Sequence, residues 1–577
     1  MIRLLTKYLK PYRLQVALVS TLVLIQSIGN LYLPELNAEI INNGVALGDT
    51  AYILRTGGFM LLVTLLLGVT SIIAVYWGSK TAMGFGRDVR HAIFRRVESF
   101  SLAEVNTFGP PSLITRNTND VQQVQMLVLL GLNMMLAAPV MSIGGVIMAL
   151  RQDVPLSGLL VVIIPLMAII IGSLMRKAIP LFKAMQVKID RVNQVMREKL
   201  SGIRVIRAFV RSDYEEARFD EANLDLTDTS LKVARLFAIM MPSVMAIFNL
   251  SLVAVMWFGG LRIDSGAMPI GNLTAFLTYI MQILMSVMMA VVMFVMVPRA
   301  AASVERINEV LDTEPQICDP AAPAADTGAC GIVEFRDVEF RYPGAEDPVL
   351  CGISFKAEPG QTTALVGSTG SGKSTLINLI PRFYDVTGGS ILVDGVDIRE
   401  MTQERLWDKV GFIPQKAFLF SGTVASNLRY GKEDATDEEL WHALKVAQGK
   451  AFVSAMPEGL DAPIAQGGTN VSGGQRQRLA IARALVKRPE VYIFDDSFSA
   501  LDFKTDSALR NALKNDITDA TVIIVAQRVS TIMHADNIIV MDNGTIVGTG
   551  THDSLMESCE TYREIVHSQL TEEEIAS

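Results

Sequence analysis

The octapeptide GSTGSGKS at residues 367–374 decides the fold of the C-terminal half of this chain. It follows a strand-like run at 363–366 and precedes a helix-like run at 375–379. In such a loop, backbone N–H groups at a helix N-terminus surround phosphates, the lysine reaches the outer phosphates, and the next hydroxyl ligates Mg²⁺. We therefore expect ATP and Mg²⁺ to bind here. The residues predicted to hold them are Gly367, Ser368, Thr369, Gly370, Ser371, Gly372, Lys373, Ser374 and Thr375, with Ser374 on the metal.

A second apolar run, at 491–494, ends in two carboxylates, Asp495 and Asp496. In phosphoryl-transfer enzymes of this class, a carboxylate at the end of a neighbouring strand helps to hold the magnesium ion and its water shell. We expect Asp495 to share the metal with Ser374. The C-terminal half is thus predicted to be an α/β P-loop domain.

Between these motifs lies the segment VSGGQRQR at 471–478, which runs into a helix-like stretch. It resembles the signature of ABC transporters, and the resemblance extends over essentially the whole chain. In that family each ATP lies between the Walker motifs of one cassette and the signature of the other, here Ser472, Gly473, Gly474 and Gln475. The resemblance further implies that Tyr342 stacks on adenine, that Gln415 senses the γ-phosphate and lies at the metal, and that Asp502 ends the D-loop at 499–502.

Two positions depart from the family pattern. The residue after the Walker B aspartate is Asp496 where fast members have a glutamate, and Gln527 occupies the position of the switch histidine. A catalytic base must lie within hydrogen-bond reach of its proton, so a carboxylate one methylene short slows hydrolysis while leaving ATP binding intact. We expect Asp496, Gln527 and Gln415 to form a slow catalytic site. The pattern resembles asymmetric bacterial multidrug exporters and predicts a second, non-identical half-transporter that carries the glutamate and the histidine.

The N-terminal half has the composition of a membrane domain. Half of all residues in the chain are hydrophobic and only 19% are charged. A membrane-spanning helix needs about 20 mostly apolar residues. Six runs qualify, at 14–34, 59–77, 126–150, 156–174, 237–260 and 273–297.

The links between these runs predict the topology. The long links after the second and fourth runs are rich in Lys and Arg, which places them in the cytoplasm. The N-terminus and the cassette then also lie in the cytoplasm, and we expect a multi-pass protein of the cell (inner) membrane, although an organelle membrane stays open. The basic segment at 3–13 is either an amphipathic helix on the inner leaflet or an ordinary basic flank of the first span. The first run is longer than a signal-peptide core, so we expect it to be retained.

These patterns predict an α-helical six-span membrane domain of the ABC exporter type fused to an α/β P-loop NTPase cassette. The expected boundaries are 1–310 for the membrane domain with its cytoplasmic coupling helices, 311–330 for a Pro/Ala/Gly linker and 331–577 for the cassette. Helical periodicity in the long links predicts that the spans continue into the cytosol. The segments 109–121 and 202–219 resemble the family's two coupling regions, and the second of these docks in the family on the opposite cassette.

The expected partners are the second half-transporter, membrane lipid and a hydrophobic small molecule. Spans five and six are rich in methionine, which repacks around apolar ligands but also simply packs helices together. Asn249, Tyr279 and Gln282 either line a cavity or make hydrogen bonds between helices. A net charge of −8 gives no reason to expect nucleic acid, and four irregularly spaced cysteines suit a reducing compartment.

Other functions stay open at this point. A lipid, peptide or siderophore transporter half has the same architecture, and an ATP-gated regulator that transports nothing is compatible with a slow site. A soluble ATPase is excluded by the six long runs without charged residues.

Overall fold

The computed structural model describes residues 1–325, 328 and 331–569, apart from the side chain of Val295. The chain divides into two compact units. The membrane unit comprises Met1–Arg96 and Pro111–Thr313, and the cassette unit comprises Val97–Pro110 and Glu314–Ser577.

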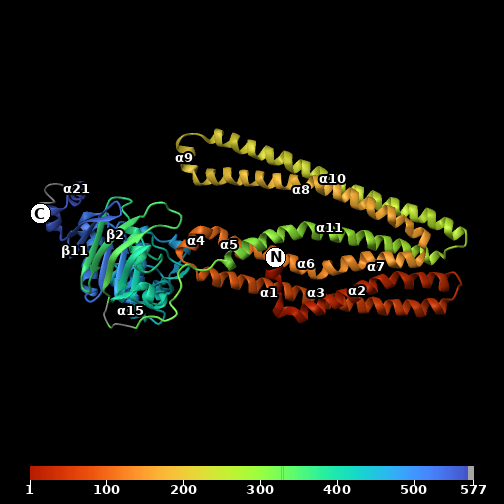
Figure 1. Cartoon of the computed structure of the whole chain (residues 1–577), viewed down its shortest axis with the longest axis horizontal. Helices are drawn as coiled ribbons and strands as arrows, with labels where there is room; N and C mark the ends of the chain where they lie inside the picture. Colours follow the sequence, from red (N-terminus) through yellow and green to blue (C-terminus); the bar gives the residue numbers. More distant parts are fainter. Residues whose placement is uncertain (326–327, 329–330, 570–577) are drawn as a thin grey trace. The chain divides into compact units, whose positions relative to one another are not determined.

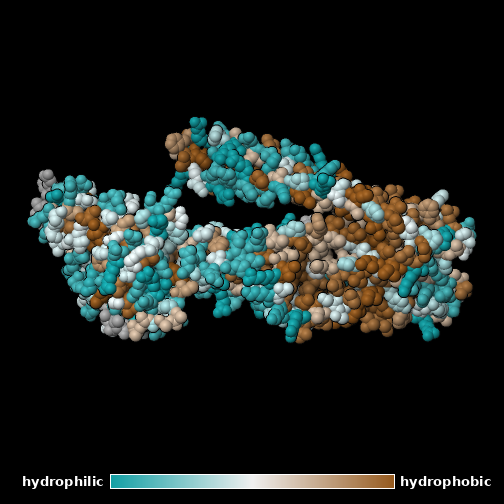
Figure 2. Space-filling model, in the orientation of Figure 1, coloured by the Kyte–Doolittle hydropathy of each residue, from teal (hydrophilic) through white to brown (hydrophobic). Residues whose placement is uncertain are grey.

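The membrane unit is built from helices (Figure 1). Six continuous helical segments are long and apolar enough to cross a membrane, which confirms the six predicted spans. Hydrophobic residues gather on the surface over these helices (Figure 2). The elements in chain order are α1 (Ile2–Leu9), η1 (Lys10–Tyr12), α2 (Arg13–Glu39), η2 (Ile40–Val45), α3 (Thr50–Glu98), α5 (Pro110–Thr115), η3 (Arg116–Asp120), α6 (Val121–Leu130), η4 (Gly131–Met135), α7 (Leu136–Gln152), α8 (Val154–Ser201), α9 (Ile203–Ala208), α10 (Ser212–Asp264) and α11 (Ile270–Asp312).

Several of these helices are much longer than a bilayer requires. Helices α3, α8, α10 and α11 contain 49, 48, 53 and 43 residues. At 1.5 Å per residue they extend about 65 to 80 Å, whereas the hydrocarbon core is about 30 Å thick. The C-terminal part of α8 and the N-terminal part of α10 extend beyond their apolar runs and lie side by side (Figure 1). Ion pairs of Lys188 with Asp225 and of Arg218 with Glu198 join them.

Contacts between helices explain two of the polar residues in the spans. Tyr279 is fully buried, and its hydroxyl donates to the carbonyl of Leu31 on α2 at 3.0 Å. Gln282 Nε2 donates to the carbonyl of Asn30 at 3.0 Å. These two residues of α11 therefore hold α11 against α2, the second of the two roles the sequence allows, whereas Asn249 is exposed.

The N-terminal basic segment packs on the protein. Leu4 of α1 is buried, the ring of Tyr8 meets Phe85 edge-on at 6.5 Å, and the Tyr12 hydroxyl donates to Asp88 at 2.8 Å. Helix α1 is thus fixed to α3 along its apolar side.

The cassette unit contains two main sheets. The larger has the order β12-β11-β3-β10-β9-β6; β12 is antiparallel and the other five strands are parallel. The smaller antiparallel sheet has the order β2-β1-β4-β5, and β7 pairs with β8. The strands are β1 (Val333–Phe340), β2 (Leu350–Ala357), β3 (Thr362–Gly367), β4 (Gly388–Val393), β5 (Val396–Asp397), β6 (Val410–Ile413), β7 (Gly422–Thr423), β8 (Pro463–Ile464), β9 (Val491–Asp495), β10 (Thr521–Val525), β11 (Asn537–Asp542) and β12 (Thr545–Gly550).

Helices cover these sheets and confirm the predicted α/β P-loop fold (Figure 1). In the parallel sheet, β3 and β9 both flank β10, so the phosphate loop and the two aspartates leave the same edge. The helices are α4 (Leu102–Phe108), α12 (Lys373–Leu379), η5 (Ile398–Glu400), α13 (Gln403–Lys409), α14 (Val424–Arg429), α15 (Asp437–Val446), α16 (Lys450–Ser454), η6 (Gly459–Asp461), η7 (Gln466–Gly468), α17 (Gly473–Lys487), α18 (Phe503–Asp516), α19 (Val529–Ile532), α20 (His552–Ser558) and α21 (Glu560–His567).

The segment of the first cytoplasmic link that joins the cassette unit lies earlier than the coupling region expected at 109–121. It is α4, whereas Pro111 onward belongs to the membrane unit. Local sequence explains the position: Ser101 and Glu104 form a capping box that starts α4, and Gly109, with φ of +74°, ends it. The short helix α9 falls inside the second expected region, 202–219.

The expected linker at 311–330 also begins within helix, because α11 runs to Asp312. From Glu314 the chain belongs to the cassette unit, where the backbone N–H of Gln403 donates to Asp319 at 2.8 Å and that of Ala324 donates to the carbonyl of Glu400 at 2.9 Å. Residues 326–327 and 329–330 of the expected linker lie outside the described residues.

Candidate nucleotide-binding site

The phosphate loop connects β3 to α12 and is closed by its own lysine. Gly370 and Gly372 have φ of +87° and +95°, a region that favours glycine, and a Cβ on Gly372 would lie 2.7 Å from Leu350 Cδ2. Lys373 Nζ donates to the carbonyls of Gly367 at 2.9 Å and Ser368 at 2.7 Å. Burial lowers the pKa of Lys373, against the opposing effect of the two nearby aspartates. An ammonium held this way gains a stronger partner when phosphate oxygens enter the loop.

The predicted metal ligands Ser374 and Asp495 lie together. Ser374 Oγ donates to Asp495 Oδ1 at 3.4 Å. Burial raises the pKa of Asp495, and the hydrogen bond from Ser374 opposes that rise. A hydroxyl and a carboxylate are oxygen donors of the kind Mg²⁺ prefers, and a cation would relieve the cost of the buried charge. These residues therefore fit Mg²⁺, whose remaining positions would be taken by water and nucleotide phosphates.

Asp496 is held rigidly beside the predicted Q-loop residue. Its carboxylate accepts a hydrogen bond from Gln415 Nε2 at 3.3 Å. Its backbone N–H donates to the carbonyl of Val525 at 2.9 Å, and its own carbonyl accepts from Ser499 Oγ at 2.8 Å. The residue is buried and has φ of +44°. Because the backbone is fixed on both sides, the length of the side chain decides how far the carboxylate reaches.

Two other predicted residues, Tyr342 and Gln527, have hydrogen-bond partners of their own. The Tyr342 hydroxyl lies 3.0 Å from Thr375 Oγ1, which ties the expected adenine contact to the helix after the phosphate loop. The Gln527 side chain is exposed, and its backbone carbonyl accepts a hydrogen bond from Gln569 Nε2 at 2.7 Å. Gln569 Oε1 in turn accepts from the N–H of Val529 at 2.9 Å. No motif in the sequence points to Gln569. It follows α21, and it reaches Gln527 and Val529 only through the tertiary fold.

The signature residues form a separate group at the N-terminus of α17. Ser472 Oγ accepts from the N–H of Gln475 at 3.2 Å, and Gln475 Oε1 accepts from the N–H of Ser472 at 2.9 Å. Ser472 and Gly473 are exposed, so this helix end is open to an anion supplied from outside the chain. A Cβ on Gly474 would lie 3.3 Å from the carbonyl of Ala500 in the expected D-loop.

Asp502 of the expected D-loop caps α18. Its carboxylate accepts from the N–H of Thr505 at 3.0 Å, and this bond lowers its pKa. The side chain thus already has a structural role in starting the helix.

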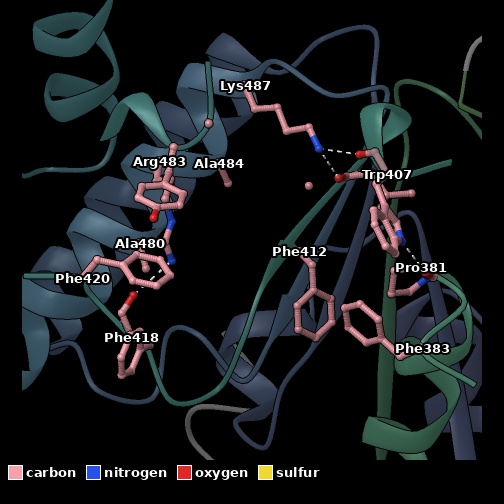
Figure 3. Close-up of a pocket in the computed structure, with 14 residues that line it drawn as sticks. Pro381, Phe383, Trp407, Phe412, Phe418, Phe420, Ala480, Arg483, Ala484 and Lys487 are labelled. Atoms are coloured by element: carbon pink, nitrogen blue, oxygen red, sulfur yellow. Dashed lines mark hydrogen bonds between the residues drawn. The ribbon is translucent and has the colours of Figure 1, made fainter. Parts of the chain in front are cut away.

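The cassette unit also contains an aromatic groove that the sequence did not reveal (Figure 3). Its volume is about 470 Å³. Phe418 and Phe420 form one wall, and Phe383, Phe412 and Trp407 form the other (Figure 3). Both cations in the lining are bonded to backbone carbonyls: Lys487 Nζ donates to Trp407 and Val410, and Arg483 Nη2 donates to Phe418.

Both halves of the chain match known families. Residues 16–287 match the ABC transporter transmembrane region, and residues 350–499 match the ABC transporter family. An uncharacterized ABC transporter ATP-binding protein of Mycobacterium tuberculosis is 50% identical over 573 residues, covering 99% of this chain and 98% of that protein.

Two further relatives have names that mention a cargo. A Bacillus subtilis protein, named as a candidate multidrug export ATP-binding/permease protein, is 33% identical over 571 residues, covering 97% of each chain. A fatty acid ABC transporter ATP-binding/permease protein of Mycobacterium tuberculosis is 34% identical over 449 residues, covering 77% of this chain and 70% of that protein.

The fold is shared with a solved structure of a bacterial Atm1-family ABC exporter with ATP bound. The TM-score is 0.78 at 23% identity, covering 98% of this chain and 99% of that one. Taken with the relatives and the six membrane-spanning helices, the conclusion is that this multi-pass membrane protein belongs to the ABC transporter family, as an exporter half whose ATPase cassette is coupled to transport.

Proposed function

We propose that this chain is one half of a heterodimeric ABC exporter and supplies it with a slowly hydrolysing ATP site. The observation that carries the proposal is Asp496, a carboxylate one methylene shorter than glutamate on a backbone fixed by Val525 and Ser499. A fixed backbone cannot move forward to make up the missing reach, so the general base stays too far from the attacking water. Gln527 adds to this, because a neutral amide cannot become a cation beside the γ-phosphate.

A non-identical partner follows from the signature. Two copies of this chain would form two slow sites, whereas a partner with the glutamate and the histidine would form one fast site with Ser472–Gln475 of this chain. The start of α17 supports that use, because Ser472 and Gly473 are exposed and the first N–H groups of a helix have no partner within it.

Two apolar surfaces support docking between halves. The tip around α9 exposes Val205, Phe209 and Val210, which are 60%, 74% and 85% exposed, and Figure 2 shows hydrophobic residues there. The aromatic groove of the cassette is large enough for side chains of this size. By the family resemblance, the α9 tip of this chain would enter the groove of the partner's cassette. The partner's tip would enter the groove of this chain (Figure 3).

For cargo we propose amphipathic or hydrophobic molecules such as drugs, taken from the cytoplasm or the inner leaflet. The methionine-rich spans support this, since Met241, Met245 and Met256 are exposed on α10, and so does the relative named for multidrug export. The relative named for fatty acids keeps a lipid cargo as the second candidate. We place the protein in the cell inner membrane with the N-terminus and the cassette in the cytoplasm, because the long links are basic.

The chain's own residues then perform these steps. The phosphate loop and Lys373 would bind the ATP phosphates, and Tyr342 would stack on the adenine. Ser374 and Asp495 would hold Mg²⁺, which would neutralise phosphate charge. Asp496, bonded to Gln415, would stay too far from the attacking water to activate it, so ATP would persist and keep the two cassettes together. Hydrolysis at the partner's site resets the transporter, as in other ATP-driven conformational cycles.

Nucleotide retention tests the proposal. The chain and its partner, co-purified in lipid, are loaded with radiolabelled Mg-ATP and chased with unlabelled ATP during turnover. We expect one label per heterodimer to remain as ATP, and to be lost in Lys373→Ala. Rapid conversion of all label to ADP would contradict a slow site.

Transport by inverted vesicles tests the cargo. ATP-dependent accumulation of a hydrophobic dye supports a drug exporter, and accumulation of labelled fatty acid alone supports the lipid candidate. If neither dye, lipid, peptide nor siderophore accumulates against a gradient, the chain is a regulator and the export proposal is wrong.

A further inference from the structure

Helix α4 is anchored inside the cassette unit by three contacts. Ala103 is buried in the same hydrophobic cluster as Phe340 and Tyr384. Glu104 accepts from the N–H of Ser101 at 2.7 Å with one oxygen and from the N–H of Gln316 at 3.2 Å with the other. The third contact is a hydrogen bond from Asn106 Nδ2 to the Tyr384 hydroxyl at 3.2 Å.

The third contact leads directly toward the nucleotide site. Tyr384 is only 9% exposed, and its ring meets the ring of Tyr342 edge-on, with centroids 5.4 Å apart and planes at 86°. Phe340 packs against both rings, at 4.9 Å from Tyr342 and 5.6 Å from Tyr384. Tyr342 is also fixed to Thr375 at 3.0 Å. The three aromatic rings therefore form one packed group between the phosphate-loop helix and α4.

We propose that Tyr384 is a positioning residue that transmits adenine binding at Tyr342 to α4. The proposal rests on the proposed adenine contact of Tyr342. A base stacked on Tyr342 restricts that ring, and edge-to-face packing passes the restriction to Tyr384 because neighbouring rings in a packed core move together. The hydroxyl of Tyr384 then holds Asn106, and with it the C-terminal end of α4.

The position of α4 gives this contact a consequence for transport. The chain enters the cassette unit at Val97 and returns to the membrane unit after Pro110, so α4 is bounded at both ends by segments of the membrane unit. Glu104 also ties α4 to Gln316, just after the end of α11. A nucleotide-dependent change in the mobility of α4 therefore reaches the chain on both sides of it.

Hydrogen exchange measured by mass spectrometry tests the proposal on the full chain in lipid. Tyr384→Phe keeps the ring and removes the hydroxyl. Tyr562→Phe is the matched control, because Tyr562 is also buried and its hydroxyl also bonds to a side chain, at 2.8 Å from His552 Nδ1. Mg-ATP is compared with Mg-tripolyphosphate, which fills the phosphate loop but has no base.

In the unsubstituted chain we expect Mg-ATP to protect both peptide 367–374 and α4, and tripolyphosphate to protect only 367–374. In Tyr384→Phe, ATP should still protect 367–374, while α4 exchanges about threefold to fivefold faster than in the unsubstituted ATP-bound chain, the loss expected for one neutral hydrogen bond. Tyr562→Phe should exchange like the unsubstituted chain.

Two results would overturn the proposal in different ways. If ATP protects α4 equally in Tyr384→Phe, or if tripolyphosphate protects α4 as well as ATP does, the coupling does not run from adenine through Tyr384. If ATP fails to protect 367–374 even in the unsubstituted chain, the nucleotide site itself is wrong, and the coupling through Tyr384 falls with it.

Discussion

Replacing Asp496 with glutamate should convert the slow ATP site into a faster one. The backbone of this residue is fixed by bonds to Val525 at 2.9 Å and from Ser499 at 2.8 Å, so Asp496→Glu would advance the carboxylate by about one carbon–carbon bond without other change. A misplacement of about 1 Å costs about 10²-fold in rate. A well-placed general base contributes about 10²- to 10⁴-fold.

We therefore expect Asp496→Glu to raise turnover at this site by about 10- to 100-fold, equivalent to about 1.4 to 2.7 kcal/mol of activation free energy. Adding Gln527→His should raise it further, because the imidazole supplies a hydrogen-bonding and chargeable group at the γ-phosphate. The assay is steady-state phosphate release from the chain in lipid, with a partner whose own catalytic glutamate is replaced by glutamine, so that turnover at this site is measured alone.

Asp496→Asn is the matched control and should bind ATP without gaining activity. The reasoning would be refuted if Asp496→Glu binds Mg-ATP with unchanged affinity and yet hydrolyses it no faster. Side-chain reach would then not be what limits the site.

Three further predictions concern buried charges. Lys409→Met removes the ammonium that lies 2.7 Å from the fully buried carboxylate of Asp394, and should cost about 3 to 5 kcal/mol of cassette stability in thermal unfolding. Lys356→Met breaks an exposed ion pair and should change the midpoint of thermal unfolding little. Equal shifts in the two variants would contradict the burial argument. Asp120→Asn weakens the hydrogen bonds that this buried carboxylate accepts from Ser303 and Arg306 of α11, and should lower the stability of the membrane unit by about 1 to 2 kcal/mol. An unchanged midpoint of thermal unfolding would contradict this. Because burial raises the pKa of Asp495, the Mg²⁺ affinity of the cassette, measured by Mg²⁺ titration, should fall on acidification at a higher pH than an ordinary aspartate would give. Asp495→Asn should stabilise the nucleotide-free cassette and remove the Mg²⁺ dependence of ATP binding. A Mg²⁺ affinity that does not change with pH would contradict this prediction.

The architecture could be predicted because its signals are local in the sequence. Each span is a continuous apolar run, and each phosphate-binding motif is a short peptide between a strand and a helix. The helical extensions beyond the bilayer were also predictable from their periodicity. Ser374 follows β3 and Asp495 ends β9, and the two residues meet because both strands flank β10.

The rest depends on tertiary contacts that no motif encodes. The family resemblance predicts the first coupling region at 109–121. No motif predicts α4 before it, which depends on the capping box at Ser101 and the bond from Asn106 to Tyr384. The groove escaped notice because its lining is scattered from Pro381 to Lys487. The contact of Gln569 with the Gln527 loop likewise joins residues 42 positions apart.

The central claim is that this chain hydrolyses ATP slowly by itself and completes a fast site in a different partner. The most direct measurement is the steady-state ATPase activity of the purified chain in lipid, first alone and then with the half-transporter encoded beside it, using a partner Walker B Glu→Gln variant as control. We predict low activity alone, high activity with the partner and low activity again with the control. Turnover of about 1 s⁻¹ or more by the chain alone, a typical enzyme rate, would show that Asp496 is a competent base and would contradict the account.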